Sequence, residues 1–549
     1  MATEPPAPAP LRRPHRAHRG PSYARRRPEE TILYQVVREQ LETFLARARE
    51  RDRPVPRFVE RELRAYLECG ILAHGFLRVH CDACGFDRLL AFSCKGRAFC
   101  PSCGGRRMAD TAAHLVDRVL PEVPVRQWVL SLPFALRYRM AWDSRLAAEV
   151  LGIFVRAVFA SLRRRARHQW GVRRGQCGAV TFVQRFGDAL NLNVHFHSLV
   201  LDGVYERGPA GTVRFHPLPP PENAEVERVA REIARRLGSL LERRGLGPEA
   251  DPSEADPLGA DEPLLAALYG ASVFGRIATG PRAGQPVLRL GDRIDADDLP
   301  VLQGERCASV AGVSLHANVA VPARDRLRLE RLGRYAGRPP VATERLSRLE
   351  DGRLLYRLKN RWRDGTTHIV FEPLEFVAKL AALVPPPRFH LVRYHGILGP
   401  CASERDRVVP VPHDPEHGDP SPARPDPARP PADGTHASSG DSTRGRPGAD
   451  GREPQREPVP PAGEPSPSRP RRLSWAELMR RVFAIDVLEC ARCGGPMRIL
   501  AAIHSPEATR AILECLGMLS RAPPALPPRP EGAEDRSLAS HLAETDACV

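Results

Sequence analysis

Two Cys-x-x-Cys pairs constrain the fold of this chain more than any other feature. Cys81 and Cys84 form the first pair, Cys100 and Cys103 form the second, and a segment of hairpin length, "GFDRLLAFSCKGRAF", separates them. Each pair presents two thiolates at a spacing that tetrahedral Zn²⁺ accepts, and four sulfur ligands disfavour Mg²⁺ and Ca²⁺. The sequence therefore predicts one structural zinc site, resembling a zinc ribbon, with these four cysteines as ligands.

Four further cysteines leave alternatives open. Cys69 and Cys94 are surplus to a four-ligand site, so each is either an alternative zinc ligand or a buried free thiol. Cys490 and Cys493 form one more pair near the C-terminus, which supplies only half of a metal site. A lone pair is weak evidence, so an additional zinc site there stays an open possibility.

The charge balance favours a polyanionic partner. Lys+Arg 82 against Asp+Glu 66 gives a formal net charge of +16, which suits nucleic acid. Only Lys95, Lys359 and Lys379 are lysines, however, and a GC-rich genome produces such an arginine excess without any functional cause. No apolar run approaches the about 18 residues of a membrane span, and no secretory signal is evident. We expect a cytoplasmic, nucleoid-associated protein with reduced cysteines and no membrane partner.

Composition and periodicity divide the chain into five parts. We expect a disordered basic arm at 1–29, a helical and zinc-binding domain at 30–110 and a mixed helix and strand domain at 111–400. A Pro-rich stretch poor in large apolar residues follows at 401–472 and is predicted to be a disordered linker. A small module with the last cysteine pair occupies 473–549. The predicted fold class is α+β.

A histidine pair lies in the largely apolar segment "LNLNVHFHSLVLDGVY". On a strand, His195 and His197 project from the same face, while Val194, Phe196 and Val200 project from the other. Gln184, in the preceding predicted strand "GAVTFVQRF", is a candidate third ligand. Such a mixed nitrogen and oxygen site suits Mg²⁺ or Mn²⁺ held against a phosphate. The alternative is a pair of hydrogen-bonded core histidines, which the motif alone would favour.

Four motifs in order carry a family resemblance: "FCPSCGGRRM", "LNVHFHSLVLDGVY", "RLGRYAGRPP" and "LVRYHGILGP". Over about residues 30–400, and again at "SWAELMRRVFAIDVLECARCGG", the chain resembles transposases of the insertion-sequence ninety-one family. These are HUH (His-hydrophobic-His) rolling-circle enzymes. The resemblance implies an antiparallel-sheet HUH endonuclease core, in which His195 and His197 hold the catalytic metal and Gln184 is a plausible third ligand.

The same resemblance implies that Tyr335 is the nucleophile. Position 331 is Arg and position 339 is Pro, so the second tyrosine of many members is missing and the chain resembles the single-tyrosine subset. Tyr335 could instead be a core aromatic, because Leu329 and Leu332 share its helix stripe. Tyr356 and Tyr394 lie in predicted strands and are weaker candidates.

The implied activity is nicking and joining of single-stranded DNA at element ends and target through a 5′-phosphotyrosine. Transesterification conserves the phosphodiester energy, and no GxxxxGK[ST] motif is present, so we expect no ATP requirement. Two other functions stay open. One is a replication initiator or relaxase with the same chemistry, and the other is a non-catalytic zinc-ribbon DNA-binding regulator.

Overall fold

The computed structural model describes residues 23–247, 256–291, 304–410 and 473–530. Most of the predicted basic arm, the part of the predicted linker (401–472) beyond residue 410 and the end of the chain from 531 lie outside the described residues. The described residues belong to one compact unit. Residues 23–29 of the predicted basic arm are described, and Tyr23 packs edge-on against Trp475 with ring centroids 5.5 Å apart.

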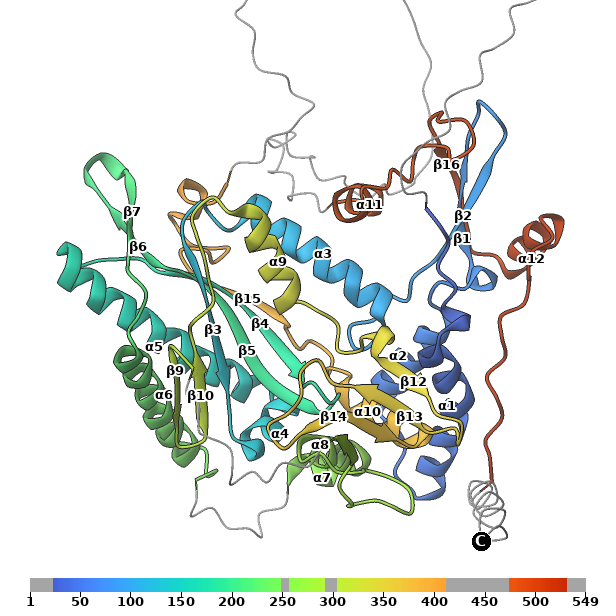
Figure 1. Ribbon diagram of the computed structural model, residues 1–549, viewed down its shortest axis with the longest axis horizontal. Helices are drawn as coiled ribbons and strands as arrows, with labels where there is room; N and C mark the ends of the chain where they lie inside the picture. Colours follow the sequence, from blue (N-terminus) through green and yellow to red (C-terminus); the bar gives the residue numbers. More distant parts are fainter. Residues whose placement is uncertain (1–22, 248–255, 292–303, 411–472, 531–549) are drawn as a thin grey trace, which may run out of the picture. The chain divides into compact units, whose positions relative to one another are not determined.

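The N-terminal part contains helices and a hairpin (Figure 1). Thr31 caps the first long helix by accepting a hydrogen bond from Tyr34 N, as a threonine at this position does. The elements are η1 (Pro28–Glu30), α1 (Ile32–Glu50), α2 (Arg57–Glu68), η2 (Leu72–His74), β1 (Phe76–His80), β2 (Asp87–Ala91) and α3 (Pro101–Arg118).

An antiparallel sheet of seven strands forms the centre of the following part. Its strands run in the order β15-β4-β5-β3-β10-β9, and β11 also pairs with β3. Their bounds are β3 (Val125–Ser131), β4 (Gly178–Phe186), β5 (Leu192–Leu201), β9 (Cys307–Val310), β10 (Val313–His316), β11 (Ala320–Val321) and β15 (Val392–Gly396). This sheet, with its helices, confirms the predicted α+β class.

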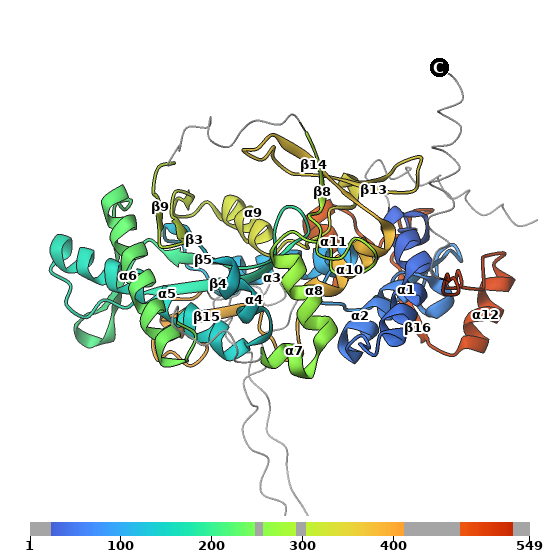
Figure 2. The same cartoon turned by 90° about the horizontal axis from the view of Figure 1, so that it is seen from below.

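The two faces of the sheet contact different helices. On one face, α5 (Ser144–Trp170) packs through Phe154, whose ring stacks on Phe196 of β5. On the other face, α3 and α9 (Arg326–Ala336) pack against a separate apolar cluster that includes Leu199 and Leu201. Figure 2 shows α9 and α5 on opposite sides of the strands. The long helix α5 begins at the capping side chain of Asp143 and ends at Gly171 in the left-handed region (φ 67°).

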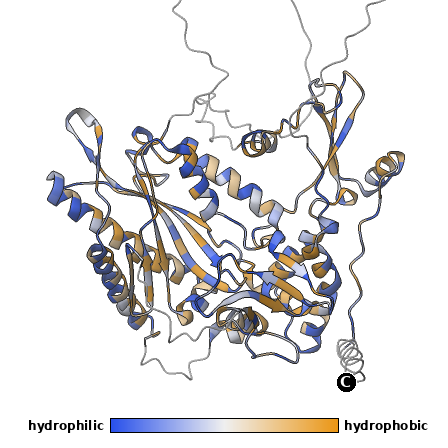
Figure 3. Cartoon of the chain, viewed as in Figure 1, coloured by the Kyte–Doolittle hydropathy of each residue, from blue (hydrophilic) through white to orange (hydrophobic). Residues whose placement is uncertain are grey.

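The remaining helices of this part surround the sheet. In α6, apolar residues face the core and charged residues face outward, a pattern visible in Figure 3. The bounds are α4 (Phe134–Trp142), α6 (Asn223–Arg243), α7 (Pro257–Asp261), α8 (Pro263–Val273) and α10 (Pro373–Leu383), with short turns η3 (Pro209–Gly211), η5 (Thr343–Arg345) and η6 (Arg405–Arg407).

Two smaller sheets complete this part. One of them is a meander, in whose turns Asp351 and Asp364 accept hydrogen bonds from the backbone N–H groups of Arg353 and Thr366. Its strand order is β12-β13-β14-β8, and β6 pairs with β7. The bounds are β6 (Gly203–Arg207), β7 (Val213–Pro217), β8 (Leu288–Gly291), β12 (Leu346–Arg348), β13 (Leu354–Arg357) and β14 (Thr366–Phe371).

The C-terminal part packs against the N-terminal hairpin of β1 and β2. It consists of α11 (Trp475–Phe483), β16 (Arg498–Ile503) and α12 (Pro506–Cys515). Strand β16 pairs antiparallel with β1, which gives a three-stranded sheet in the order β16-β1-β2. Within the described residues, no helix is long and apolar enough to cross a membrane.

Candidate active site and metal centres

The histidine pair lies on β5, between β4 and β3. His195 and His197 are 7% and 5% exposed, and their Nε2 atoms are 3.0 Å apart. Val194, Phe196 and Val200 face the opposite side, toward α5. The predicted alternation of this strand is therefore confirmed, and the two imidazoles face α3 and α9.

Gln184 lies directly opposite His195 on β4. Its Nε2 donates a hydrogen bond to the carbonyl of Ala336, at the end of α9, over 2.6 Å. Its Oε1 is buried without a hydrogen-bond partner. A buried orphan carbonyl is costly, so this oxygen beside two imidazoles fits a ligand set that is completed by a cation. The donor set of two nitrogens and one oxygen suits a divalent metal with positions left for a phosphate.

The hydrogen bonds behind the imidazoles determine which nitrogens are free. His195 Nδ1 donates to Asn193 O over 2.9 Å, which leaves Nε2 as the lone-pair nitrogen. Nε2 of Gln127, on β3, lies 2.8 Å from His197 Nδ1, and rotation of the amide places its oxygen at the same position, because the two orientations have nearly the same shape. When the amide oxygen faces Nδ1, it accepts the Nδ1–H and leaves the second Nε2 free as well.

Both histidines are neutral at pH 7. Burial lowers the pKa of His195 to about 4. Burial, followed by the charges of His195 and Arg338, lowers the pKa of His197 to about 2. A neutral imidazole is the form that binds a metal, so the fold keeps both side chains ready to coordinate.

Tyr335 is the tyrosine that lies beside the histidine pair. Its ring is 39% exposed and its centroid is 6.1 Å from that of His197, in an edge-on arrangement. Leu329 of the same helix is buried, so the stripe that Tyr335 was predicted to share ends before it reaches the tyrosine. Tyr356 is 1% exposed and its hydroxyl accepts from Ala342 N, and Tyr394 packs against the apolar cluster of α3 and α9.

Two cations flank Tyr335, and sequence reasoning missed both. The guanidinium carbon of Arg338 lies 4.3 Å from the ring centroid, and Lys359 Nζ lies 4.5 Å from it. Arg338 also lines a cavity of about 100 Å³ together with Gln184. The available signal was the rarity of lysine: Lys359 is one of three in the chain. The surroundings of Tyr335 are therefore cationic, as a phosphate-binding site requires.

The cysteines form two clusters, and the predicted grouping of Cys81 and Cys84 with Cys100 and Cys103 is wrong. The first cluster consists of Cys69, Cys94, Cys100 and Cys103. The second consists of Cys81, Cys84, Cys490 and Cys493. In each cluster the four sulfurs lie within 4.8 Å of one another, and all eight thiols are free.

The geometry of both clusters fits zinc. Nearest sulfurs are 3.4 to 3.7 Å apart in the first cluster and 3.5 to 3.6 Å apart in the second. Tetrahedral ligands with Zn–S near 2.3 Å have sulfurs about 3.8 Å apart. The first cluster joins the end of α2, the loop after β2 and the start of α3. Cys69 and Cys94, whose roles the sequence left open, complete this cluster. Cys69 follows α2 directly, Cys94 lies in the loop after β2, and both lie beside Cys100 and Cys103 at the start of α3.

Comparisons with known proteins identify two matching families. The family model described as "Putative transposase" matches residues 178–406, which include the histidine pair and Tyr335. The family model described as "Transposase zinc-binding domain" matches residues 36–132, which include the first cysteine cluster. No curated protein matches the chain, and no solved structure does.

Proposed function

Because the chain belongs to the insertion-sequence ninety-one family of transposases, with a zinc-binding domain near its N-terminus, we propose that it is an HUH-type enzyme. In this proposal it nicks and rejoins single-stranded DNA at element ends through a 5′-phosphotyrosine. Family membership supports a transposase over a replication initiator or a relaxase with the same chemistry.

One observation carries the proposal. The rings of Tyr335 and His197 are nearly perpendicular with centroids 6.1 Å apart, and Gln184 of β4 donates a hydrogen bond to the end of α9, the helix that carries Tyr335. A nucleophile and a three-ligand set thus meet at one point although they come from strands and a helix far apart in sequence. A structural histidine pair would not need an unpartnered amide oxygen beside it.

The residues divide the reaction between them. The phenolic oxygen of Tyr335 bonds to phosphorus while the P–O3′ bond breaks, which leaves a 5′-phosphotyrosine and a free 3′-hydroxyl. The phenol proton passes to water, which reaches the partly exposed side chain, and the leaving 3′ oxygen takes up a proton. Arg338 and Lys359 stabilise the phenolate and the negative charge of the phosphate.

His195, His197 and Gln184 would hold a divalent cation, Mg²⁺ or Mn²⁺. Such an ion polarises the phosphate and neutralises charge as the bonds exchange. Resealing is the same exchange in reverse, so no ATP is consumed.

The test is adduct formation by the full chain with Mg²⁺ or Mn²⁺ and 3′-labelled single-stranded DNA carrying an element end. We expect the label on the tryptic peptide containing Tyr335. Tyr335→Phe keeps the ring but removes the nucleophile, so the adduct should disappear while zinc content and DNA binding persist. His195→Ala with His197→Ala should also abolish cleavage and largely preserve binding.

Three results would contradict the proposal. Label on Tyr356 or Tyr394 would reject Tyr335 as the nucleophile. Normal cleavage by the double histidine variant would make the pair structural. DNA binding without any metal-dependent nicking would favour the non-catalytic regulator.

A further inference from the structure

The second cysteine cluster joins two parts of the chain that are far apart in sequence. Cys81 and Cys84 follow β1, whereas Cys490 and Cys493 precede β16. Cys81 Sγ lies 3.5 Å from Cys493 Sγ, and Cys84 Sγ lies 3.6 Å from Cys490 Sγ. The two matched family ranges end at 132 and 406, so neither includes the C-terminal pair.

The C-terminal pair has the backbone arrangement of a metal knuckle. Arg492 N and Gly495 N each point at a cysteine sulfur, Cys490 and Cys493 respectively, over 3.4 Å. Such N–H groups stabilise thiolates. Two knuckles that face each other supply the four sulfurs that a closed structural zinc site needs.

The apolar core around this cluster is small. Besides two of the cysteines, its buried members are Val79, Leu90 and Met497. Pairing of β16 with β1 and a hydrogen bond from Arg88 to Val487 O (2.6 Å) add polar contacts. A buried core of this size is typical of modules that a structural metal stabilises.

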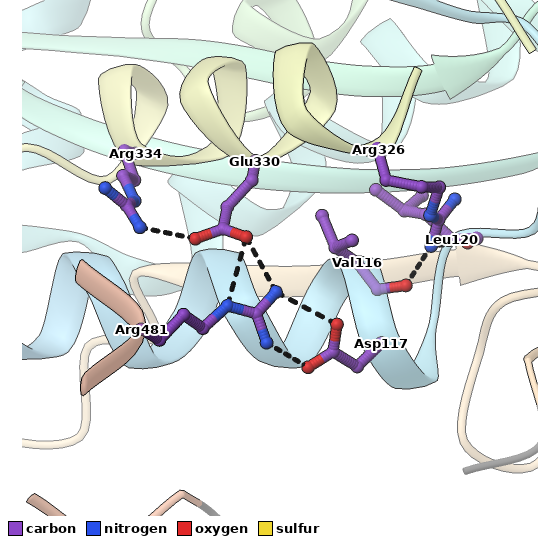
Figure 4. Close-up of polar contacts among 7 residues, drawn as sticks. All are labelled: Val116, Asp117, Leu120, Arg326, Glu330, Arg334 and Arg481. Atoms are coloured by element: carbon purple, nitrogen blue, oxygen red, sulfur yellow. Dashed lines mark hydrogen bonds and ion pairs between the residues drawn. The ribbon is translucent and has the colours of Figure 1, made fainter. Parts of the chain in front are cut away.

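Helix α11, just before the C-terminal knuckle, contacts the helix that carries Tyr335 (Figure 4). Arg481 of α11 donates to Glu330 of α9 through Nε over 3.1 Å and Nη2 over 2.6 Å. The same guanidinium pairs with both carboxylate oxygens of Asp117 on α3. Arg481 thus connects α11 to both α9 and α3.

Glu330 requires this contact. Its carboxylate is nearly buried, and its ion-pair partners are Arg481 and Arg334. A buried carboxylate that loses a partner is costly, so removal of Arg481 favours a shift of α9 that brings Glu330 to water. Tyr335 and Ala336, which receives the Gln184 hydrogen bond, would move with the helix.

We propose that Cys81, Cys84, Cys490 and Cys493 bind a second structural zinc ion, and that this ion holds α11 where Arg481 positions the helix bearing Tyr335. The zinc assignment stands on the cysteine geometry alone. The positioning role rests on the proposed function of Tyr335, so the two parts are tested by separate measurements.

The first measurement is the zinc content of the reduced, untagged full chain by elemental analysis. We expect two zinc ions per chain in the wild type and one in the Cys490→Ser, Cys493→Ser variant. Cys515→Ser, which replaces an exposed cysteine outside both clusters, is the matched control and should retain two. One zinc ion in the wild type, or two in the double variant, would overturn the second site.

The second measurement is single-stranded DNA cleavage. Arg481→Ala should lower kcat on the order of 10- to 100-fold with little change in KM, because misplacement of the nucleophile affects the step and not the binding. Arg481→Lys, which keeps the charge, should recover part of the loss. Arg480→Ala removes the neighbouring arginine, which pairs with Asp486, and should behave like wild type.

The outcomes separate the two proposals. If Arg481→Ala has the same kcat as the unmutated protein, the positioning role is overturned. The proposed function is unaffected by that result, because it is judged from tyrosine adduct formation by the unmutated protein. A wild type that holds two zinc ions but forms no tyrosine adduct would reject the proposed function and with it the positioning role, and would leave the second zinc site established.

Discussion

At the scale of single residues, each ligand candidate has one polar end fixed and the other free. The amide nitrogen of Gln184 is bonded to Ala336 O, and Nδ1 of His195 is bonded to Asn193 O. The opposite ends differ: Gln184 Oε1 has no hydrogen-bond partner, and His195 Nε2 lies 3.0 Å from His197 Nε2. A buried orphan of this sort costs about 1–3 kcal/mol, which a bound cation would offset.

Gln127 should tune metal affinity without touching the metal. Gln127→Met removes the group behind His197 Nδ1, so we expect the Mg²⁺ or Mn²⁺ concentration for half-maximal cleavage to rise about 10- to 100-fold. Gln127→Glu restores an acceptor at that nitrogen and should return the requirement toward the wild-type value. An unchanged metal requirement in Gln127→Met, measured by metal titration of nicking, would remove this residue from the site.

His395 of β15 should make stability depend on pH. Burial lowers its pKa to about 4, and its Nε2 has no hydrogen-bond partner. The folded-state pKa lies below the ordinary value of about 6.5, so this contribution to stability is complete above pH 6.5 and is lost as pH falls toward 4. The loss is at most about 3 kcal/mol over that window.

His395→Phe should therefore reduce the dependence of the unfolding free energy on pH between about 6.5 and 4, and the part due to His195 and His197, whose pKa values are also lowered by burial, should remain. Urea titrations at several pH values measure this slope. His390→Phe, which replaces an exposed histidine nearby in the chain, is the control and should keep the wild-type slope. Equal slopes in His395→Phe and the wild type would contradict the assignment.

At the scale of elements, α3 is the support on which α9 lies. Arg326, in the first turn of α9, donates to the carbonyls of Leu120 over 2.9 Å and Pro121 over 3.2 Å, and also to Val116 O. These carbonyls lie at and just beyond the end of α3, where a cation also opposes the helix dipole. Gly333 permits close contact, since a Cβ there would lie 3.3 Å from Ala112 Cβ.

Loss of this cap should destabilise the helix pair. Arg326→Ala should lower the unfolding free energy by about 2 kcal/mol, because three carbonyls lose a charged donor. Arg328→Ala on the exposed side of α9 should change it by less than about 0.5 kcal/mol. Chemical denaturation of the two variants measures the difference, and equal midpoints would show that the cap contributes nothing.

The helix and strand that carry the candidate site were predictable from the sequence, whereas the contacts between elements that complete the site were not. The alternation around His195 specifies a strand, and Pro339 and Pro340 after Tyr335 specify the end of a helix; both elements are present. Lys359 lies in the turn between β13 and β14, and no local pattern indicates that this turn reaches Tyr335. The sequence did not indicate Gln127 either, because its contact with His197 follows from the pairing of β3 with β5.

At the scale of the whole molecule, the cysteine pairs illustrate why tertiary partners escape sequence reasoning. Adjacent pairs suggest a common ion, yet β1 and β2 carry Cys81 and Cys84 away from α3, and the C-terminal knuckle supplies their partners. Cys69 and Cys94, which no Cys-x-x-Cys pattern marks, fill the places left beside Cys100 and Cys103. The local pairs were recognisable, but their assignment to ions depends on how the chain ends meet.

The last prediction distinguishes the two arrangements directly. If Cys69 and Cys94 are zinc ligands, Cys69→Ser with Cys94→Ser should lower the zinc content by one ion per chain and destabilise the start of α3, because a site with two thiolates left does not hold the ion. If instead the adjacent pairs share one ion, the same variant should keep all of its zinc. Elemental analysis of the reduced variant decides between them, and thermal unfolding with and without a chelator measures the stability that the ion provides. Cys177→Ser, which removes a buried thiol outside both clusters, controls for loss of a buried sulfur and should keep the wild-type zinc content.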